Sequence, residues 1–391
     1  MIEFYDIYLQ PEERDMTKLI LVLSLVCLGL LWGEDRRVRR DRARLTHVVY
    51  VNGIRGKSTV TRLIDAGLRA GGWKVFCKTT GTVPMTIGTD NVERPLVRRG
   101  RANIKEQIKV LRRAAGEGAQ VLVVECMAVD PALQAVSQDR MVRSDIGVIT
   151  NVRLDHTAEM GQTLEEICDA LSNTIPRGGR LFTADRRFFQ QLEENGRARG
   201  CRVEYIGPEG APSGLDFPEN TALALAVCQA LGVERERALE GMGRYQPDPY
   251  ALSALRLSGG AVFVNALSVN DPQSTQAVYR RVSALPGLAG RELVLLVNNR
   301  PDRGYRTQHM ELVAKALRPK EIWLIGASQR AARRGLERAL PGTPVRLFRD
   351  VGALPLGEQG QNALIFGAGN LAGPGKALLQ RVKEEGEPYA L

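Results

Sequence analysis

VNGIRGKST, residues 51–59, stands between an apolar run at 47–51 and a helical pattern that begins at Lys57. Its two glycines allow the backbone to curl, so that several N–H groups can point at phosphate oxygens. The N-terminus of the following helix adds a partial positive charge. In a loop of this kind Lys57 would reach the β- and γ-phosphates, and the hydroxyl of Ser58 would be a magnesium ligand.

The loop departs from the usual phosphate-loop pattern at one position. That pattern has a glycine five residues before Gly56, where this chain has Val51, so that G-x-x-G-K-S remains. The alternative interpretation is a glycine-rich turn with an incidental lysine. The order of strand, loop and helix favours a nucleotide site, and the residues predicted to bind the nucleotide are Gly53, Ile54, Arg55, Gly56, Lys57, Ser58 and Thr59.

From His47 onward, short β-rich runs alternate with helical patterns. The runs typical of buried parallel strands are 47–51, 74–78, 121–125, 145–151, 180–184 and 202–206. Helices are expected to start at Lys57, near Ala102 and at Thr163, where Thr163 and Glu166 match a capping box, with another at about 219–231. This alternation predicts an α/β fold with a P-loop-type, doubly wound parallel sheet and helices on both faces.

The stretch at 243–252 contains two prolines and is interpreted as a linker. Beyond it the strand pattern starts again, at 261–265, 292–299, 321–325, 344–348 and 362–367. A second, smaller α/β domain is therefore predicted. The chain divides into an N-terminal segment at 1–33, a nucleotide-binding domain at 34–250 and a C-terminal domain at 251–391.

The N-terminal segment is apolar from Leu19 to Trp32, or over 16–33 with its edges. Acidic residues precede it, and six arginines between Arg36 and Arg44 follow it directly. By the positive-inside rule this predicts a single transmembrane helix with its N-terminus outside and a cytoplasmic body. A secretory signal would begin with basic residues. A buried core helix is the alternative, because the uninterrupted apolar run is shorter than the roughly 20 residues of a straight span.

The composition limits the other possible functions. The six cysteines form no C-x-x-C pair, which indicates reduced thiols rather than a disulfide scaffold or a zinc site. The net charge of +10 suits an acidic partner or a membrane surface. No stretch resembles a nucleic-acid-binding module, so no nucleic-acid partner is expected.

Two further residues are candidates for metal binding. Glu125 closes the run at 121–125, and the carboxyl ends of parallel strands are where such sheets bind ligands. A carboxylate there suits a hard cation, although it could also be a solvated strand end. His156 follows the strand at 145–151. A lone histidine is more often structural, but this position, close to the predicted phosphate site, favours a functional role.

Three motifs together resemble a known superfamily. The loop G-x-x-G-K-S-T, a glutamate that ends a strand, and T-N-x-x-x-D-H are similar to those of the ATP-dependent Mur ligases and folylpolyglutamate synthases, over roughly residues 47–310. Within that superfamily the chain is most similar to the poly-γ-glutamate synthase B subunits. The strings that carry this likeness are VNGIRGKSTVTRLI, KTTGTVP, ECMAV, ITNVRLDH, VNALSVNDPQST, NNRPDR and GAGN.

The resemblance implies roles for individual residues. Lys57, Glu125 and His156 match catalytic positions, and Ser58, Glu125 and His156 match the positions that bind magnesium. Asn220 matches an asparagine near the adenine. The first turn of the C-terminal domain corresponds to Asn270, Asp271, Pro272 and Ser274, of which Asp271 is expected to contact the nucleotide. Thr80, Arg300 and Arg303 are expected to bind the substrate, because an arginine fork can hold a carboxylate or a phosphate.

This chain also differs from its relatives. Many Mur ligases hold a second magnesium with a carbamylated lysine, yet no lysine lies between Lys109 and Lys315. Asn265 stands where the family has an aspartate that contacts the ribose. A membrane segment replaces the UDP-sugar-binding domain before the phosphate loop, which argues against a peptidoglycan precursor as substrate.

The resemblance implies an ADP-forming ligase that uses ATP and Mg²⁺ to join glutamate through its γ-carboxyl, by way of an acyl phosphate. Expected partners are glutamate, poly-γ-glutamate, the membrane, other membrane subunits of a synthase and further copies of the chain. Two alternatives stay open: a folylpolyglutamate- or peptidoglycan-type ligase, and a membrane-attached nucleotide-binding regulator without ligase activity. Amine-dependent phosphate release would separate the ligases from the regulator.

Overall fold

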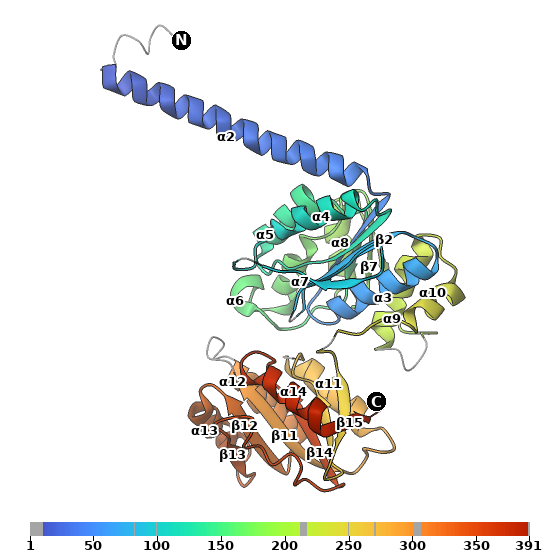
Figure 1. Ribbon diagram of the computed structural model, residues 1–391, viewed down its shortest axis with the longest axis vertical. Coiled ribbons are helices and arrows are strands. Elements are labelled where there is room, and N and C mark those ends of the chain that lie inside the picture. Colours follow the sequence, from blue (N-terminus) through green and yellow to red (C-terminus); the bar gives the residue numbers. More distant parts are fainter. Residues whose placement is uncertain are drawn as a thin grey trace.

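The computed structural model describes residues 11–81, 83–98, 100–211, 217–248, 250–269, 271–299 and 306–389. These residues form two α/β domains, one above the other, and a long N-terminal helix that projects from the larger domain (Figure 1).

The larger domain contains an eight-stranded sheet with the order β4-β3-β2-β5-β1-β6-β7-β8. The six parallel strands are β1 (His47–Asn52), β2 (Val75–Thr79), β5 (Val121–Glu125), β6 (Ile146–Ile149), β7 (Arg180–Thr183) and β8 (Arg202–Tyr205). They confirm the predicted doubly wound sheet. The antiparallel edge strands β3 (Met85–Ile87) and β4 (Glu93–Pro95) were not predicted, because three residues are too few to show an alternating pattern.

Helices cover both faces of this sheet. They are α3 (Lys57–Ala70), α4 (Glu106–Gly116), α5 (Pro131–Val136), the π-helix η1 (Ser137–Val142), α6 (Thr157–Met160), α7 (Leu164–Ser172), α8 (Phe189–Arg197), α9 (Pro218–Ala230) and α10 (Arg235–Met242). The capping box at α7 is present as predicted. Helix α4 starts four residues later than expected, because the side chain of Asn103 accepts a hydrogen bond from the backbone of Lys105 (2.9 Å) and forms a turn there.

The smaller domain is built on a seven-stranded sheet with the order β13-β12-β11-β14-β10-β9-β15. Its strands are β9 (Ser253–Leu257), β10 (Val262–Asn265), β11 (Glu292–Asn299), β12 (Glu321–Gly326), β13 (Val345–Leu347), β14 (Ala363–Ala368) and β15 (Gly386–Tyr389). Its helices are α11 (Pro272–Ser283), α12 (Arg306–Leu317), α13 (Gln329–Ala339) and α14 (Pro374–Glu385). The five predicted strands are present and parallel, and the unpredicted β9 and β15 pair antiparallel at one edge.

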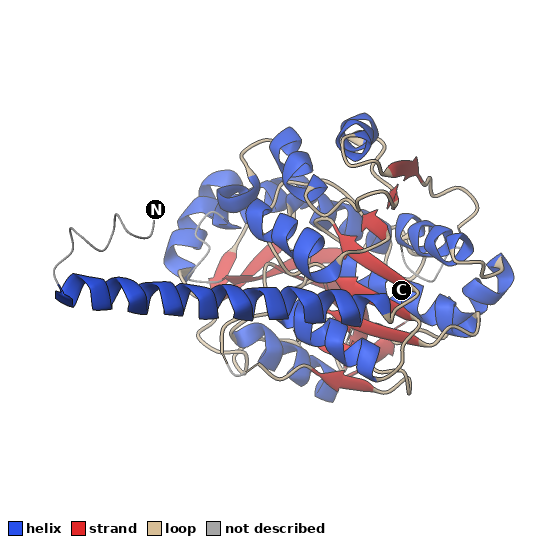
Figure 2. Ribbon diagram, turned by 90° about the horizontal axis from the view of Figure 1, so that it is seen from above, coloured by secondary structure: helices blue, strands red, loops and turns tan. Residues whose placement is uncertain are grey.

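The predicted apolar helix is part of a longer one, α2 (Pro11–Ala43). Among the described residues, α2 is the one helix long and apolar enough to cross a membrane, and its apolar segment is entirely exposed. Its last turns pack on the larger domain, where Val38 is buried with Val110 and Leu111 of α4. In both views α2 runs unbroken from the body and extends beyond it (Figures 1 and 2).

The packing of α2 can be tested by changing valine to alanine at a buried and at an exposed position of this helix. Val38→Ala should lower the free energy of unfolding of the larger domain by about 1–3 kcal/mol, because it removes buried methyl groups. Val22→Ala, on the exposed part of the same helix, is the control and should leave that free energy unchanged. Urea unfolding of the detergent-solubilised chain measures both, and equal stabilities would mean that α2 is not docked.

Candidate active site

The phosphate loop between β1 and α3 has a backbone that only glycine accommodates at two positions. Gly53 has φ +122° and Gly56 has φ +81°. A Cβ atom at Gly53 would lie 2.1 Å from Thr150 Oγ1, and one at Gly56 would lie 2.5 Å from Asn220 Oδ1. The loop therefore curls tightly at the N-terminus of α3, as the sequence predicts.

The residues that follow β6 hold this loop in place. The Thr150 hydroxyl donates to the carbonyl oxygen of Arg55 (2.6 Å), and the Asn151 amide donates to the same oxygen (3.0 Å). Asn151 also accepts hydrogen bonds from the backbone of Arg55 through its side chain (3.0 Å) and from that of Ile54 through its carbonyl (3.2 Å). These bonds shape the loop from a neighbouring strand end.

The side chain of Lys57 folds back over the loop. Its ammonium donates to the carbonyl oxygens of Gly53 (2.8 Å) and Ile54 (3.2 Å). Burial lowers the pKa of Lys57, while the nearby carboxylate of Glu125 opposes that shift. A half-buried cation held by neutral carbonyls can be drawn to an anionic phosphate, because the phosphate offers the charge that the carbonyls lack.

Ser58 and Glu125 lie together at the carboxyl end of the sheet. The Ser58 hydroxyl donates to Glu125 Oε2 (2.8 Å), and the backbone N–H of Thr80 donates to the same oxygen (2.7 Å). The Gln107 side chain donates to the Glu125 carbonyl (3.1 Å) and fixes the strand end. A hydroxyl and a carboxylate side by side are oxygen ligands of the kind that magnesium takes, so this pair fits the predicted ion.

Arg55 joins the phosphate loop to the smaller domain. Its guanidinium donates to Asp155 Oδ2 (2.9 Å) and to Asp271 Oδ2 (2.7 Å). Both carboxylates are almost completely buried, at 4% and 2% exposure. Asp271 is also the N-cap of α11, where its other oxygen accepts from the backbone of Ser274 (2.8 Å). A second bond between the domains runs from Arg153 to Gln273 (3.1 Å).

His156 is the N-cap of helix α6 and has a left-handed backbone, φ +52°. Its ring nitrogens lie 3.9 Å from a carboxylate oxygen of Asp155 and 3.9 Å from one of Glu159. Among the described residues no group of three or more histidine, cysteine, aspartate and glutamate side chains is arranged to hold a metal ion. The role of His156 as a second magnesium ligand stays a prediction.

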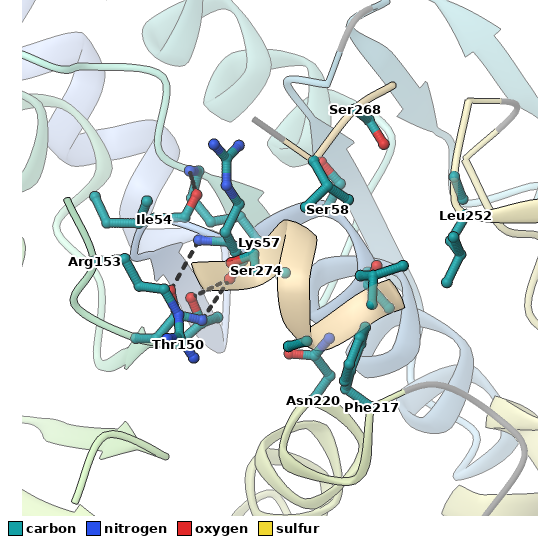
Figure 3. Close-up of a pocket in the computed structure, with 18 of the residues that line it drawn as sticks. Ile54, Lys57, Ser58, Thr150, Arg153, Phe217, Asn220, Leu252, Ser268 and Ser274 are labelled. Atoms are coloured by element: carbon teal, nitrogen blue, oxygen red, sulfur yellow. Dashed lines mark hydrogen bonds between the residues drawn. The ribbon is translucent and has the colours of Figure 1, made fainter. Parts of the chain in front are cut away.

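A cavity of about 1400 Å³ opens between the two domains. Lys57, Ser58, Glu125 and His156 all line it, so the predicted catalytic side chains share one space. Figure 3 shows Phe217 and Asn220, at the start of α9, and Leu252, Ser268 and Ser274 of the smaller domain around it. A second cavity of about 280 Å³ adjoins the phosphate loop and is lined by Arg98, Met127, Ala128, Val129 and Met160 among others.

The sequence analysis missed a buried ion cluster beside this second cavity. Lys78, at the end of β2, is fully buried and pairs with Glu106 (2.9 Å), and Arg98 donates to the same carboxylate (2.7 Å). Burial lowers the pKa of Lys78, and the charge of Glu106 opposes that shift. Lys78 begins the string KTTGTVP, but Arg98 and Glu106 lie in no recognised motif, so only the fold shows that the three side chains meet.

Two other predicted residues, Thr80 and Asn220, line the large cavity between the domains. The backbone N–H of Thr80 donates to the Glu125 carboxylate, and the side chain of Asn220 lies next to Gly56 of the phosphate loop. Asn265 is buried, and its amide donates to the carbonyl oxygen of Ala251 (2.9 Å). Asn270, Arg300 and Arg303 lie outside the described residues, so their predicted roles stay predictions.

Comparisons with known proteins agree with this arrangement. A model of the Mur ligase middle domain matches residues 51–216, and a model of the poly-gamma-glutamate synthase CapB C-terminal domain matches residues 254–385. The PGA synthase CapB of Bacillus subtilis is 34% identical over 388 residues, which are 94% of this chain and 97% of the relative. The chain belongs to the CapB family of poly-γ-glutamate synthases.

Further matches place the CapB family within a wider fold. The capsule biosynthesis protein CapB of Bacillus anthracis is also 34% identical, over 96% of this chain and 85% of its own length. The solved structure of E. coli FolC in complex with DHPP and ADP has the same fold, with a TM-score of 0.65, 15% identity and coverage of 89% of this chain and 92% of FolC. The family resemblance predicted from the motifs is confirmed.

The loop geometry predicts a sharp difference between two glycines. Gly53→Ala should weaken ATP binding at least about tenfold, which corresponds to roughly 1.4 kcal/mol, because the new methyl group displaces the loop from Thr150. Gly72→Ala is the matched control, since Gly72 also has positive φ (+89°) but has no atom within 4 Å of the added Cβ. It should cost stability and leave ATP affinity unchanged. Fluorescent-nucleotide titration of both variants measures this, and equal affinities would contradict the loop assignment.

Proposed function

We propose that this protein is an ATP-dependent ligase that joins glutamate units through the γ-carboxyl group and releases ADP and phosphate. The single observation that carries the proposal is the meeting of Lys57, Ser58 and Glu125 at the mouth of the phosphate loop in a cavity between two domains. The names of the relatives, PGA synthase CapB and capsule biosynthesis protein CapB, support poly-γ-glutamate as the product.

The residues present fit ATP and a divalent cation. The N–H groups of the phosphate loop and the ammonium of Lys57 would hold the β- and γ-phosphates. Ser58 and Glu125 would hold magnesium, which neutralises charge on the transferred phosphoryl group. Asn220 would lie by the adenine and Asp271 would contact the nucleotide, as the family resemblance implies. Arg300 and Arg303, with Thr80, would bind the carboxylate substrate.

The reaction needs no nucleophilic side chain from the protein. A γ-carboxylate oxygen attacks the γ-phosphorus of ATP, the bond from that phosphorus to the bridging oxygen breaks, and ADP leaves. The neutral amine of the next glutamate then attacks the acyl carbon and loses a proton, and the carbon–oxygen bond breaks to release phosphate. Lys57 would stabilise the charge that develops during the first transfer, since its ammonium lies over the phosphate loop and lines the cavity.

The site of action that we propose is a membrane. The exposed apolar segment of α2 would cross it once, with the catalytic body on the cytoplasmic side, as the arginines after the segment indicate. Other membrane subunits and further copies of the chain would complete a synthase. Five arginines line the cavity between the domains, and they and the basic net charge suit a polyanionic product.

The activity can be tested by removing the phosphate-binding lysine. Incubation with ATP, Mg²⁺ and glutamate should give glutamate-dependent phosphate release and γ-linked oligomers by mass spectrometry. Lys57→Ala should abolish both while the fold stays intact, whereas Lys74→Ala, the same change at an exposed lysine, should keep them. Phosphate release that does not depend on an amine acceptor would favour the regulator instead of a ligase.

Titration with magnesium can distinguish the roles of the two predicted metal ligands, His156 and Glu125. His156→Ala should raise the magnesium concentration needed for turnover more than it weakens ATP binding, because no lysine lies between Lys109 and Lys315 to match the carbamylated lysine that holds a second ion in many Mur ligases. Glu125→Ala should weaken the affinity for ATP-magnesium itself. Turnover measured against magnesium, with nucleotide affinity measured separately, distinguishes the two. A His156→Ala enzyme that matches the wild type at every magnesium concentration would make this histidine structural.

A further inference from the structure

Helix α5 presents apolar side chains to solvent, which is unusual for this body. Outside α2, the large apolar residues exposed among the described residues are Val92, Val97, Leu133, Val136, Leu154 and Leu312. Leu133 and Val136 lie on α5, at 44% and 41% exposure. Helix α5 continues into η1 without a break, and the spacing of Leu133, Val136 and the exposed Arg140 puts all three on one face.

The face formed by Leu133, Val136 and Arg140 lies close in sequence to a contact with α2, just after the apolar segment of that helix. Arg143 follows η1, and its guanidinium lies 3.2 Å from Asp35 of α2. Asp35 is only two residues beyond Gly33, where the apolar segment ends. Residues at this point of a transmembrane helix lie in the headgroup layer of the bilayer. The end of η1 therefore lies at the level of the headgroups when α2 spans a membrane.

Several ion pairs join α2 to the body. Lys105 lies 3.8 Å from Glu34, and Arg112 lies 3.8 Å from Asp41. The two pairs are seven residues apart on both segments of the chain, so α2 and α4 run side by side in the same direction. Arg42 pairs with Asp145 and donates to the carbonyl of Arg143 (2.8 Å). A helix fixed on both sides sets the orientation of the body relative to the membrane.

The orientation brings α5 toward the bilayer. Figure 1 shows α5 and α6 on the side of the larger domain toward which the apolar half of α2 protrudes. Leu154, just before α6, adds a third exposed apolar side chain on this side. Exposed arginines lie on the same two elements: Arg140 on the face itself, and Arg36, Arg37 and Arg40 on α2.

We propose that the Leu133–Val136–Arg140 face is a second membrane contact, which rests on an anionic bilayer surface and holds the catalytic body against it. Apolar side chains bordered by arginines are the pattern of an interfacial helix, since the first enter the headgroup boundary and the second bind lipid phosphates. The inference rests on the proposed insertion of α2. Lipid is the occupant because the face continues the end of the transmembrane segment and carries the charge that anionic headgroups attract.

The contact also has a consequence for the smaller cavity. Met127, Ala128 and Val129 line that cavity and lead into Asp130, the N-cap of α5, while Met160 at the end of α6 lines it too. One wall of the cavity beside the phosphate loop is thus built by segments that adjoin the lipid surface. A polyanion that is extended beside the phosphate loop and leaves through the smaller cavity would emerge close to the membrane.

Fluorescence on the full-length chain tests the proposal. In a Cys27→Ser background, in which the remaining cysteines are buried, Val136→Cys carries an environment-sensitive dye. Glu236→Cys on the exposed surface of α10 is the control. In vesicles that contain phosphatidylglycerol, the dye at 136 should shift to shorter wavelength and be quenched by headgroup-attached nitroxide, and the dye at 236 should not. Arg140→Glu, or vesicles of phosphatidylcholine alone, should abolish most of the shift.

The possible outcomes distinguish a membrane contact of the Leu133–Val136–Arg140 face from insertion of α2. If the protein floats with the vesicles but position 136 behaves like position 236, the second contact is wrong and the anchor stands. If the protein does not float with vesicles, the insertion of α2 fails, and this inference fails with it. If the shift appears equally in detergent and grows with protein concentration, a second copy of the chain covers the face instead of lipid.

Discussion

The ion pairs of Arg55 with Asp155 and Asp271 are the interaction on which the site depends. They tie three parts of the chain together: the phosphate loop, the turn before His156 and the first helix of the smaller domain. Two carboxylates that are almost fully buried need this guanidinium, because breaking a buried pair costs about 3–5 kcal/mol. The cavity between the domains is defined by this joint. Since Arg55 lies in the phosphate loop itself, the segment proposed to bind nucleotide phosphates is also the one that pairs with the smaller domain.

The larger sheet explains why the other chemical groups meet at this joint. Strands β5, β1 and β6 are adjacent and parallel, so Glu125, the phosphate loop and the Thr150–Asn151 pair all emerge at one edge. The hydrogen bonds from Thr150 and Asn151 shape the loop, and Glu125 accepts from Ser58 within it. Helix α4 adds a link to the anchor, since Gln107 fixes the carbonyl of Glu125 and the same helix packs against α2. The sheet edge that carries Glu125 and the helix α2 thus belong to one packed domain.

Sequence reasoning predicts this edge because its signals are local. The phosphate loop, the strand that ends at Glu125 and the capping box at Thr163 each depend on a few neighbouring residues, and each is present. The short edge strands and the late start of α4 could not be predicted, because three-residue strands lack a period and one asparagine turn delays the helix. The pairing of Arg55 with Asp271 joins residues 216 positions apart and carries no motif. The Lys78–Glu106–Arg98 cluster could not be predicted either, because only the fold brings its three residues together and a lysine in a strand gives no sign of its burial.

We propose that the γ-carboxyl group is activated by direct phosphorylation in this cavity. This step can be measured by supplying glutamate with ¹⁸O in the γ-carboxyl group, together with ATP and magnesium, and analysing the released phosphate by mass spectrometry. The account predicts that one ¹⁸O atom appears in inorganic phosphate for each amide bond formed, because the carboxylate oxygen that attacks the γ-phosphorus leaves with it. Amide formation with unlabelled phosphate, or with the label in AMP, would contradict it.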